Sequence, residues 1–205
     1  MKTFNQITLK TSLIIMVCAI STIISAQIPT LVNGGFEQWA PYQGPDTFLS
    51  YSTSNGFGYF LTCEATVWSV PGRTGDAIHL ESQFEDSTSI IPGAVGLGEF
   101  CNGGLKGGLY YPHSPDSLVF WTRHNLIAGD TSFLAVFHRG AAPRIAAFHR
   151  FFGSQSSWMR ISIPLPAQPT GFDTIAFIAY SSDPNGGKDG SWLELDDMEL
   201  IGSTG

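Results

Sequence analysis

Short apolar runs separated by turn residues dominate this 205-residue chain after its first 26 residues. No segment keeps a 3.6-residue apolar period with helix caps, whereas strand-like alternation between turn signals is frequent. Such a pattern predicts an all-β protein, an antiparallel jelly-roll β-sandwich that forms one domain over residues 27–205. The strand-like runs lie at 76–82, 117–124, 131–139, 144–152, 158–163, 174–180 and 191–201.

Residues 1–26 have the features of a secretory signal peptide. Lys2 and Lys10 give a positive start, residues 13–24 form an apolar stretch, and Ala26 is a small residue suited to cleavage. The apolar stretch is too short for a confident membrane span. We therefore expect a mature chain from residue 27 that is secreted or held at the cell surface, in the periplasm or on the outer surface.

The charge of the chain argues against two classes of partner. Ten Lys and Arg oppose 17 Asp and Glu, for a net charge of −7. No basic stripe is available to neutralise phosphates, so nucleic acid and anionic membranes are unsuited as ligands. Neutral glycans and divalent cations remain compatible with this charge.

Two cysteines follow the predicted cleavage site, Cys63 and Cys101. In an exported chain they favour a disulfide, because a free thiol outside the cell is open to oxidation. The alternative is a pair of buried free thiols, and spacing alone does not decide between the two.

The two ends of the mature chain form a matched pair. Asn33-Gly-Gly-Phe-Glu-Gln-Trp39 places an acid and two aromatics after a glycine turn, and the run 191–201 carries Asp196 and Asp197 in its middle. Asp is depleted in strands, and an unpaired buried carboxylate is costly. We expect terminal strands side by side, with the acids around a cation or within a hydrogen-bond network.

Four patches stand out in order along the chain: 33–39, 115–121, 129–131, and 181–182 followed by 190–197. Together they resemble the PCMD carbohydrate-metabolism family and the wider galactose-binding-like jelly rolls of exported Bacteroidetes-type proteins. The resemblance implies a jelly-roll fold, export, a carbohydrate-related role and a structural Ca²⁺ held by Glu37 and Asp196. If the last strand is regular, Asp197 lies on the face opposite Asp196, so only one of the pair should be a ligand. The alternative is that Glu37 caps a turn and Asp196 accepts backbone N–H bonds.

The candidate ligand-binding residues are aromatic and cationic. Trp and Tyr rings pack on the C–H faces of sugars, while Arg and His donate hydrogen bonds to hydroxyls or to a uronate carboxylate. Most aromatics of a sandwich are core residues, and most surface cations pair with acids, so both alternatives stay open. The candidates are Tyr110, Tyr111, Trp121, Arg123 and His138.

Catalytic signatures are absent from the sequence: it has no Gly-x-Ser-x-Gly elbow, His-Glu-x-x-His motif or phosphate loop. We therefore predict no catalytic residue and a non-catalytic module that binds a poly- or oligosaccharide. One alternative is a glycoside hydrolase or lyase on the same fold, since Glu64, Glu81, Glu85 and Glu99 could supply acids but nothing selects a pair. Another is a structural or adhesive surface module with a protein partner.

Overall fold

A computed structural model describes most of the chain after residue 64 and two short segments before it. The described residues are 31, 33–39, 52–54, 65–84, 89–101, 104–111, 114–139, 144–168 and 172–202. Every regular element among them is a β-strand. Within these ranges we find no helix long and apolar enough to cross a membrane.

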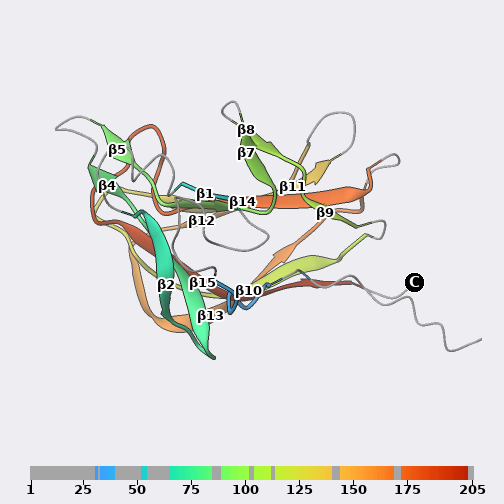
Figure 1. The fold of residues 1–205 in the computed structure, drawn as a ribbon, viewed down its shortest axis with the longest axis horizontal. Coiled ribbons are helices and arrows are strands. Elements are labelled where there is room, and N and C mark those ends of the chain that lie inside the picture. Colours follow the sequence, from blue (N-terminus) through green and yellow to red (C-terminus); the bar gives the residue numbers. More distant parts are fainter. Residues whose placement is uncertain are drawn as a thin grey trace, which may run out of the picture. The chain divides into compact units, whose positions relative to one another are not determined.

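The first of two large sheets has six strands, all antiparallel to their neighbours (Figure 1). The strand β14 lies at its centre and pairs with β11 on one side, while β12 forms the edge beyond β11. In order, the strands are β1 (Ser52–Thr53), β6 (Ala94–Gly96), β14 (Thr174–Tyr180), β11 (Ser132–Arg139) and β12 (Arg144–Phe151), and β9 (Leu109–Tyr110) also pairs with β14.

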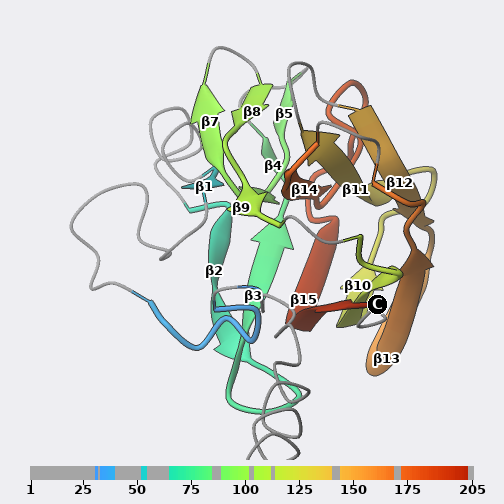
Figure 2. The same ribbon diagram turned by 90° about the vertical axis from the view of Figure 1, so that its right-hand side faces the viewer.

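The second large sheet has five strands, and the last strand of the chain lies at its centre (Figure 2). Two strand pairs that are distant in the chain meet there, because β15 pairs with β10 on one side and with β3 on the other. In order, the strands are β13 (Ser154–Pro164), β10 (Ser117–Asn125), β15 (Trp192–Ile201), β3 (Asp76–Glu81) and β2 (Val67–Pro71).

The two sheets bury their inner faces against each other. Alternation along each strand sends one set of side chains inward. Phe120 of the five-stranded sheet meets Phe151 of the six-stranded sheet edge to face, with 6.3 Å between ring centroids. Fully or almost fully buried inward residues include Ile78, Leu80, Leu118, Leu193, Leu195, Leu134, Val136, Ile175 and Phe177. This arrangement is the predicted jelly-roll β-sandwich.

A buried serine cluster joins the sheets at one edge. The hydroxyl oxygen of Ser82, which follows β3, lies 2.7 Å from those of both Ser181 and Ser182, which follow β14. All three serines are inaccessible to solvent. Their mutual hydrogen bonds satisfy polar groups that would be costly to bury alone.

The N-terminal segment 33–39 lies beside the last strand, as expected, but it forms a turn and not a strand. The amide of Met198 donates to the carbonyl oxygen of Gly34 at 2.8 Å. The condition for placing Asp197 on the face opposite Asp196, a regular strand, is not met, because Asp197 has a φ of 46° and the pairing with β10 shifts between Val119 and Trp121. A β-bulge therefore interrupts β15 where the two acids lie.

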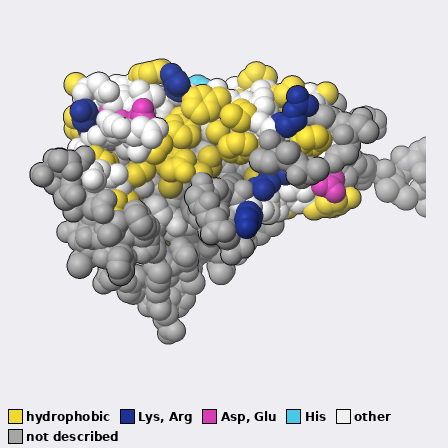
Figure 3. Space-filling view, turned by 90° about the horizontal axis from the view of Figure 1, so that it is seen from above, with side chains coloured by type: hydrophobic (Ala, Val, Ile, Leu, Met, Phe, Trp, Pro, Cys, Tyr) yellow, Lys and Arg dark blue, Asp and Glu magenta, His cyan; other side chains and the backbone are white. Residues whose placement is uncertain are grey.

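Two small ribbons complete the described strands: β4 (Gln83–Phe84) with β5 (Ile90–Ile91), and β7 (Glu99–Cys101) with β8 (Gly104–Lys106). The outer face of the six-stranded sheet carries exposed apolar side chains (Figure 3).

The predicted signal peptide and Cys63 lie outside the described residues, as does the side chain of Cys101. The signal peptide and the disulfide therefore stay predictions.

Candidate functional site

A row of polar and aromatic side chains crosses the outer face of the five-stranded sheet. Strand register creates it, because Trp68 of β2 lies opposite His79 of β3, and His79 lies opposite Glu194 of β15. Glu194 in turn lies opposite Arg123 of β10. Directly opposed residues of antiparallel strands have their side chains on the same face and in contact. Four residues far apart in the sequence thus form one continuous row.

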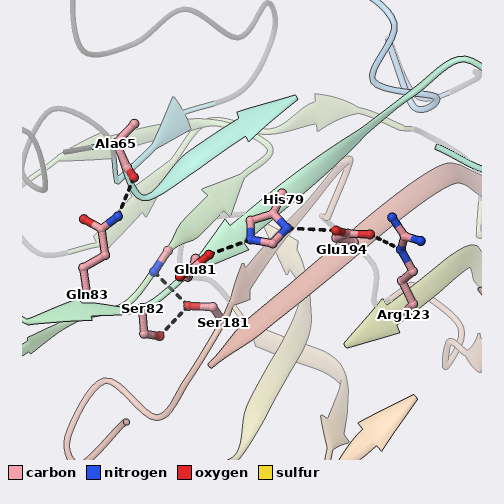
Figure 4. A network of polar contacts seen from close by, with 9 residues as sticks. Ala65, His79, Glu81, Ser82, Gln83, Arg123, Ser181 and Glu194 are labelled. Atoms are coloured by element: carbon pink, nitrogen blue, oxygen red, sulfur yellow. Dashed lines mark hydrogen bonds and ion pairs between the residues drawn. The ribbon is translucent and has the colours of Figure 1, made fainter. Parts of the chain in front are cut away.

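At the centre of this row, His79 lies between two carboxylates (Figure 4). Its Nδ1 is 2.9 Å from Oε1 of Glu194, and its Nε2 is 3.0 Å from Oε2 of Glu81. Both contacts are hydrogen bonds between ring and carboxylate only when each ring nitrogen carries a proton. The geometry therefore fits an imidazolium held by two carboxylates.

Two tryptophans cover the faces of the His79 ring. The ring of Trp68 stacks on it with 4.4 Å between centroids, and that of Trp192 with 5.5 Å. His79 is 8% exposed, whereas both tryptophans are half-buried. Each tryptophan turns one face to His79, so its other face and its indole edge are the parts available to a ligand.

Arg123 ends the polar part of the row. Its Nε donates to Oε2 of Glu194, and its guanidinium carbon lies 4.8 Å from the ring centroid of Trp158 on β13. Glu194 is thus bonded through both oxygens, and its side chain is only 6% exposed. The side chain of Arg123 is 30% exposed, so its remaining N–H groups can donate to a ligand. With His79 protonated, two cations balance Glu81 and Glu194.

The hairpin turn between β2 and β3 bounds this surface. The backbone N–H of Arg73 donates to Oδ2 of Asp196 at 2.7 Å, and its guanidinium Nε donates to Oδ2 of Asp197 at 2.9 Å. The same guanidinium lies over the ring of Trp121, 4.7 Å from its centroid. The turn therefore crosses β15 and holds Arg73 above Trp121. Opposite Trp121 on the edge strand β13 lies the exposed Arg160.

The structure brings together two of the five predicted ligand-binding residues. Trp121 and Arg123 share the outer face of β10: Arg123 belongs to the row, and Trp121 lies next to it. Tyr110 is 64% exposed but lies on β9 of the other sheet. Tyr111 is fully buried, and His138 is 2% exposed on the inner face of β11. These last two present no surface to a soluble glycan in this structure.

Burial also determines the ionisation of several histidines away from the row. It lowers the pKa of His138 and of His149 below the ordinary histidine value. Burial likewise lowers the pKa of His124, with a weaker contribution from His149. Nε2 of His138 has no hydrogen-bond partner within the described part of the chain. Burial thus favours the neutral form of all three histidines.

The two acids expected to hold calcium reach the same turn from different sides. Oε2 of Glu37 accepts the N–H of Asp76 at 3.1 Å, and Asp196 accepts that of Arg73. Asp196 is fully buried, and burial raises its pKa. Two carboxylates with turn carbonyls are the hard oxygen donors that Ca²⁺ takes. Among the described residues, however, no group of three or more His, Cys, Asp and Glu side chains could hold a metal. The N–H bonds also match the alternative in which both acids only cap backbone groups.

The row itself was not singled out in the sequence. Its signal is the shared spacing of Ala77, His79 and Glu81 with Trp192, Glu194 and Asp196, which puts each set on one strand face. The pairing of β3 with β15 in this register joins residues that are more than 100 positions apart in the sequence. Alternation of side chains along one strand shows which residues share a face, but it does not show which strand lies beside it.

No family model matches the chain, and no curated protein matches it. Solved structures do match. The chain is similar to TmCBM61, solved in complex with β-1,4-galactotriose, with a TM-score of 0.51 and 17% identity over 84% of this chain and 97% of that one. This likeness shows the fold alone. Two further matches have lower TM-scores. The family 11 carbohydrate-binding module of cellulosomal cellulase Lic26A-Cel5E of Clostridium thermocellum matches with a TM-score of 0.41 and 16% identity over 86% of this chain and 96% of that one. A cyclase from Fischerella sp. TAU matches with a TM-score of 0.48 and 14% identity over 85% of this chain and 96% of that one.

Proposed function

We propose that this chain is an exported, non-catalytic carbohydrate-binding module. Its glycan binds along the outer face of the five-stranded sheet. The observation that carries the proposal is the row Trp68–His79–Glu194–Arg123, which ends beside Trp158. Sugar recognition needs aromatic rings for C–H faces and a few fixed polar groups for hydroxyls. The likeness to the fold of TmCBM61 supports the same function.

The row suits recognition because its polar groups are already oriented. Glu194 and His79 are fixed by the hydrogen bonds that they make with each other and with their neighbours, so little side-chain freedom is lost when a ligand binds. Arg123 and Glu81 keep part of their surface open, with side-chain exposures of 30% and 31%. These two, with the free indole edges, can donate to or accept from sugar hydroxyls.

The carboxylates of the row support binding better than hydrolysis. A glycosidase needs one acid free to protonate or attack and a second across the scissile bond. Here His79 bonds both Glu81 and Glu194, and Glu194 is also occupied by Arg123. Both acids are therefore already engaged by neighbouring side chains, Glu194 through both of its oxygens.

The test is affinity electrophoresis of the purified protein through gels that contain soluble polysaccharides. The panel includes a β-1,4-galactan, because TmCBM61 was solved with β-1,4-galactotriose. We expect one glycan class to retard the protein without a gain in reducing ends. Trp68→Ala should weaken binding by about 2 kcal/mol, or roughly thirtyfold. Phe148→Ser, on the opposite sheet, is the control and should leave retardation unchanged.

Three results would contradict the proposal. Shortening of the polymer would make the protein an enzyme, and Glu81→Gln would then show whether that acid takes part. No retardation on a broad panel would favour a structural or adhesive module. Retardation that survives Trp68→Ala and Trp192→Ala would place the glycan elsewhere on the molecule.

We also propose that a structural Ca²⁺ joins the N-terminal turn to the last strand through Glu37 and Asp196. The support is the convergence of both carboxylates on the turn 72–76 and the donor chemistry of the ion. The ion would offset the cost of keeping Asp196 ionised in a fully buried position. It would hold the bulge of β15 without taking part in glycan contacts.

A further inference from the structure

The outer face of the six-stranded sheet carries a second, different surface. Its exposed members are Ile145 at 65% and Phe148 at 45%, both on the edge strand β12. Cross-strand pairing puts them on one face with half-buried Phe133 and Phe137 of β11 and with Tyr180 of β14. Figure 3 looks at the molecule from the side of this sheet and shows apolar side chains gathered there, with Lys and Arg around them. We call these five residues the apolar face.

The rings of the apolar face pack on one another. Phe133 stacks on Phe148 with 5.1 Å between centroids and lies against Tyr180 at 5.0 Å in a tilted arrangement. The guanidinium of Arg150 covers Phe148 from 5.4 Å. Few ring faces are left for sugar stacking, and the face offers few hydrogen-bonding groups besides guanidinium. It therefore suits an apolar protein surface better than a glycan.

Two arginines at this edge are without acidic partners. Arg144 and Arg150 are exposed on β12, and neither forms an ion pair with any residue that the structure describes. On a chain with a net charge of −7, cations left unpaired beside an apolar face favour a partner that brings Asp or Glu. Arginine and aromatic residues are also the types enriched in protein interfaces.

The same arginines disfavour a second copy of this chain as the partner. A two-fold antiparallel pairing of β12 centred on Ala147 would set Arg144 of one copy opposite Arg150 of the other. Like charges directly opposed across strands are destabilising, and charges on an edge strand are a known protection against self-association.

We propose that the β11–β12 edge and the apolar face bind an acidic protein segment in extended conformation. The segment would pair with the free edge of β12, which has only β11 as a strand partner among the described residues. Its apolar side chains would cover Phe148 and Ile145, and an acid on the same face would meet Arg150, which lies over Phe148. An acid at an intervening position would meet Arg144, which lies opposite His138 and therefore on the other face of β12. Added strands gain affinity from main-chain hydrogen bonds and specificity from alternate side chains. This surface is separate from the glycan face and does not depend on it.

The test uses two synthetic peptides of about ten residues that share alternating Phe and Val, a length suited to one added strand. One peptide carries Glu at the intervening positions and at one end of the apolar set, so that acids are present on both faces of the strand, and the other carries Lys at all of these positions. We expect the Glu peptide to bind, more weakly as salt rises, and the Lys peptide not to bind. Arg144→Gln or Arg150→Gln should weaken binding roughly fivefold each, the effect of one exposed ion pair. The matched control Lys188→Gln removes an exposed charge from a loop and should not change it.

The opposite outcomes overturn the proposal. Equal binding of both peptides, binding of neither, or binding indifferent to the two arginines would refute it. A concentration-dependent dimer lost in Phe148→Ser would assign the face to a second copy. Glycan retardation lost in Phe148→Ser but kept in Trp68→Ala would assign it to sugar. Failure of glycan binding alone would leave this proposal standing.

Discussion

Removal of the charge of Glu194 should destabilise the protein far more than removal of an exposed charge on the same strand. Glu194→Gln keeps the volume but sets an amide N–H₂ against one of two donors, His79 Nδ1 or Arg123 Nε. Removal of one partner of a buried ion pair costs about 3–5 kcal/mol, and solvent at the 30% exposed Arg123 side chain reduces this cost. We expect a loss of about 2–3 kcal/mol.

The assay is thermal and urea unfolding, followed by tryptophan fluorescence. For a domain of this size, the loss corresponds to a fall in Tm of roughly 5–10 °C. The control is Glu199→Gln, because the side chain of Glu199 on β15 is exposed and makes no hydrogen bond or ion pair with any residue that the structure describes. It should change stability by less than about 0.5 kcal/mol. If both variants unfold at the same temperature, the row is not an organised network and the reasoning is refuted.

Three further predictions concern other parts of the fold. Burial lowers the pKa of His138 in the folded protein, so below the ordinary histidine pKa the unfolded chain binds more protons than the folded protein does. The free energy of unfolding should therefore fall as the pH is lowered from about 7.5 to 5.5. His138→Phe should make this fall smaller. If Ca²⁺ binds at Glu37 and Asp196, saturation of the protein with Ca²⁺ should raise the Tm by roughly 5–10 °C, and EDTA should reverse this rise. Glu37→Gln should abolish the shift. A Tm that Ca²⁺ does not change would refute the site. Gly75 and Gly153 both have positive φ, but only at Gly75 would a Cβ displace the Glu37 carboxylate from the N–H of Asp76. Gly153→Ala should cost roughly 1 kcal/mol of backbone strain, and Gly75→Ala that strain plus roughly 1 kcal/mol for the lost hydrogen bond, so equal melting would contradict this packing.

Most of the fold could be predicted from local pattern. The strand expected at 174–180 is observed as β14, and those expected at 117–124, 131–139, 144–152 and 191–201 differ by one residue at one end. β13 begins four residues before the predicted start at Trp158. The prediction missed residues 154–157 because they are all polar and carry no apolar alternation. The short strand β6 was missed, since three small or β-branched residues give little periodic signal.

The candidate site could be predicted only in part. Alternation along β10 correctly placed Trp121 and Arg123 on one face. The pairing of β3 with β15, which brings His79 to Glu194, is long-range and has no local signature. Tyr110 and Tyr111 show the same limit: neighbours in a strand point to opposite sides, so one is exposed and the other fully buried.

The most direct test of the glycan face is an NMR titration of the indole N–H signals with the oligosaccharide that the affinity gels select. The chain has five tryptophans, and their indole signals can be assigned by substitution. We predict that the signals of Trp68, Trp192 and Trp158 shift with saturation. That of Trp39, whose indole donates to the carbonyl oxygen of Phe36 at 2.6 Å, should stay in place. Saturable binding that leaves the first three signals unmoved would contradict the account.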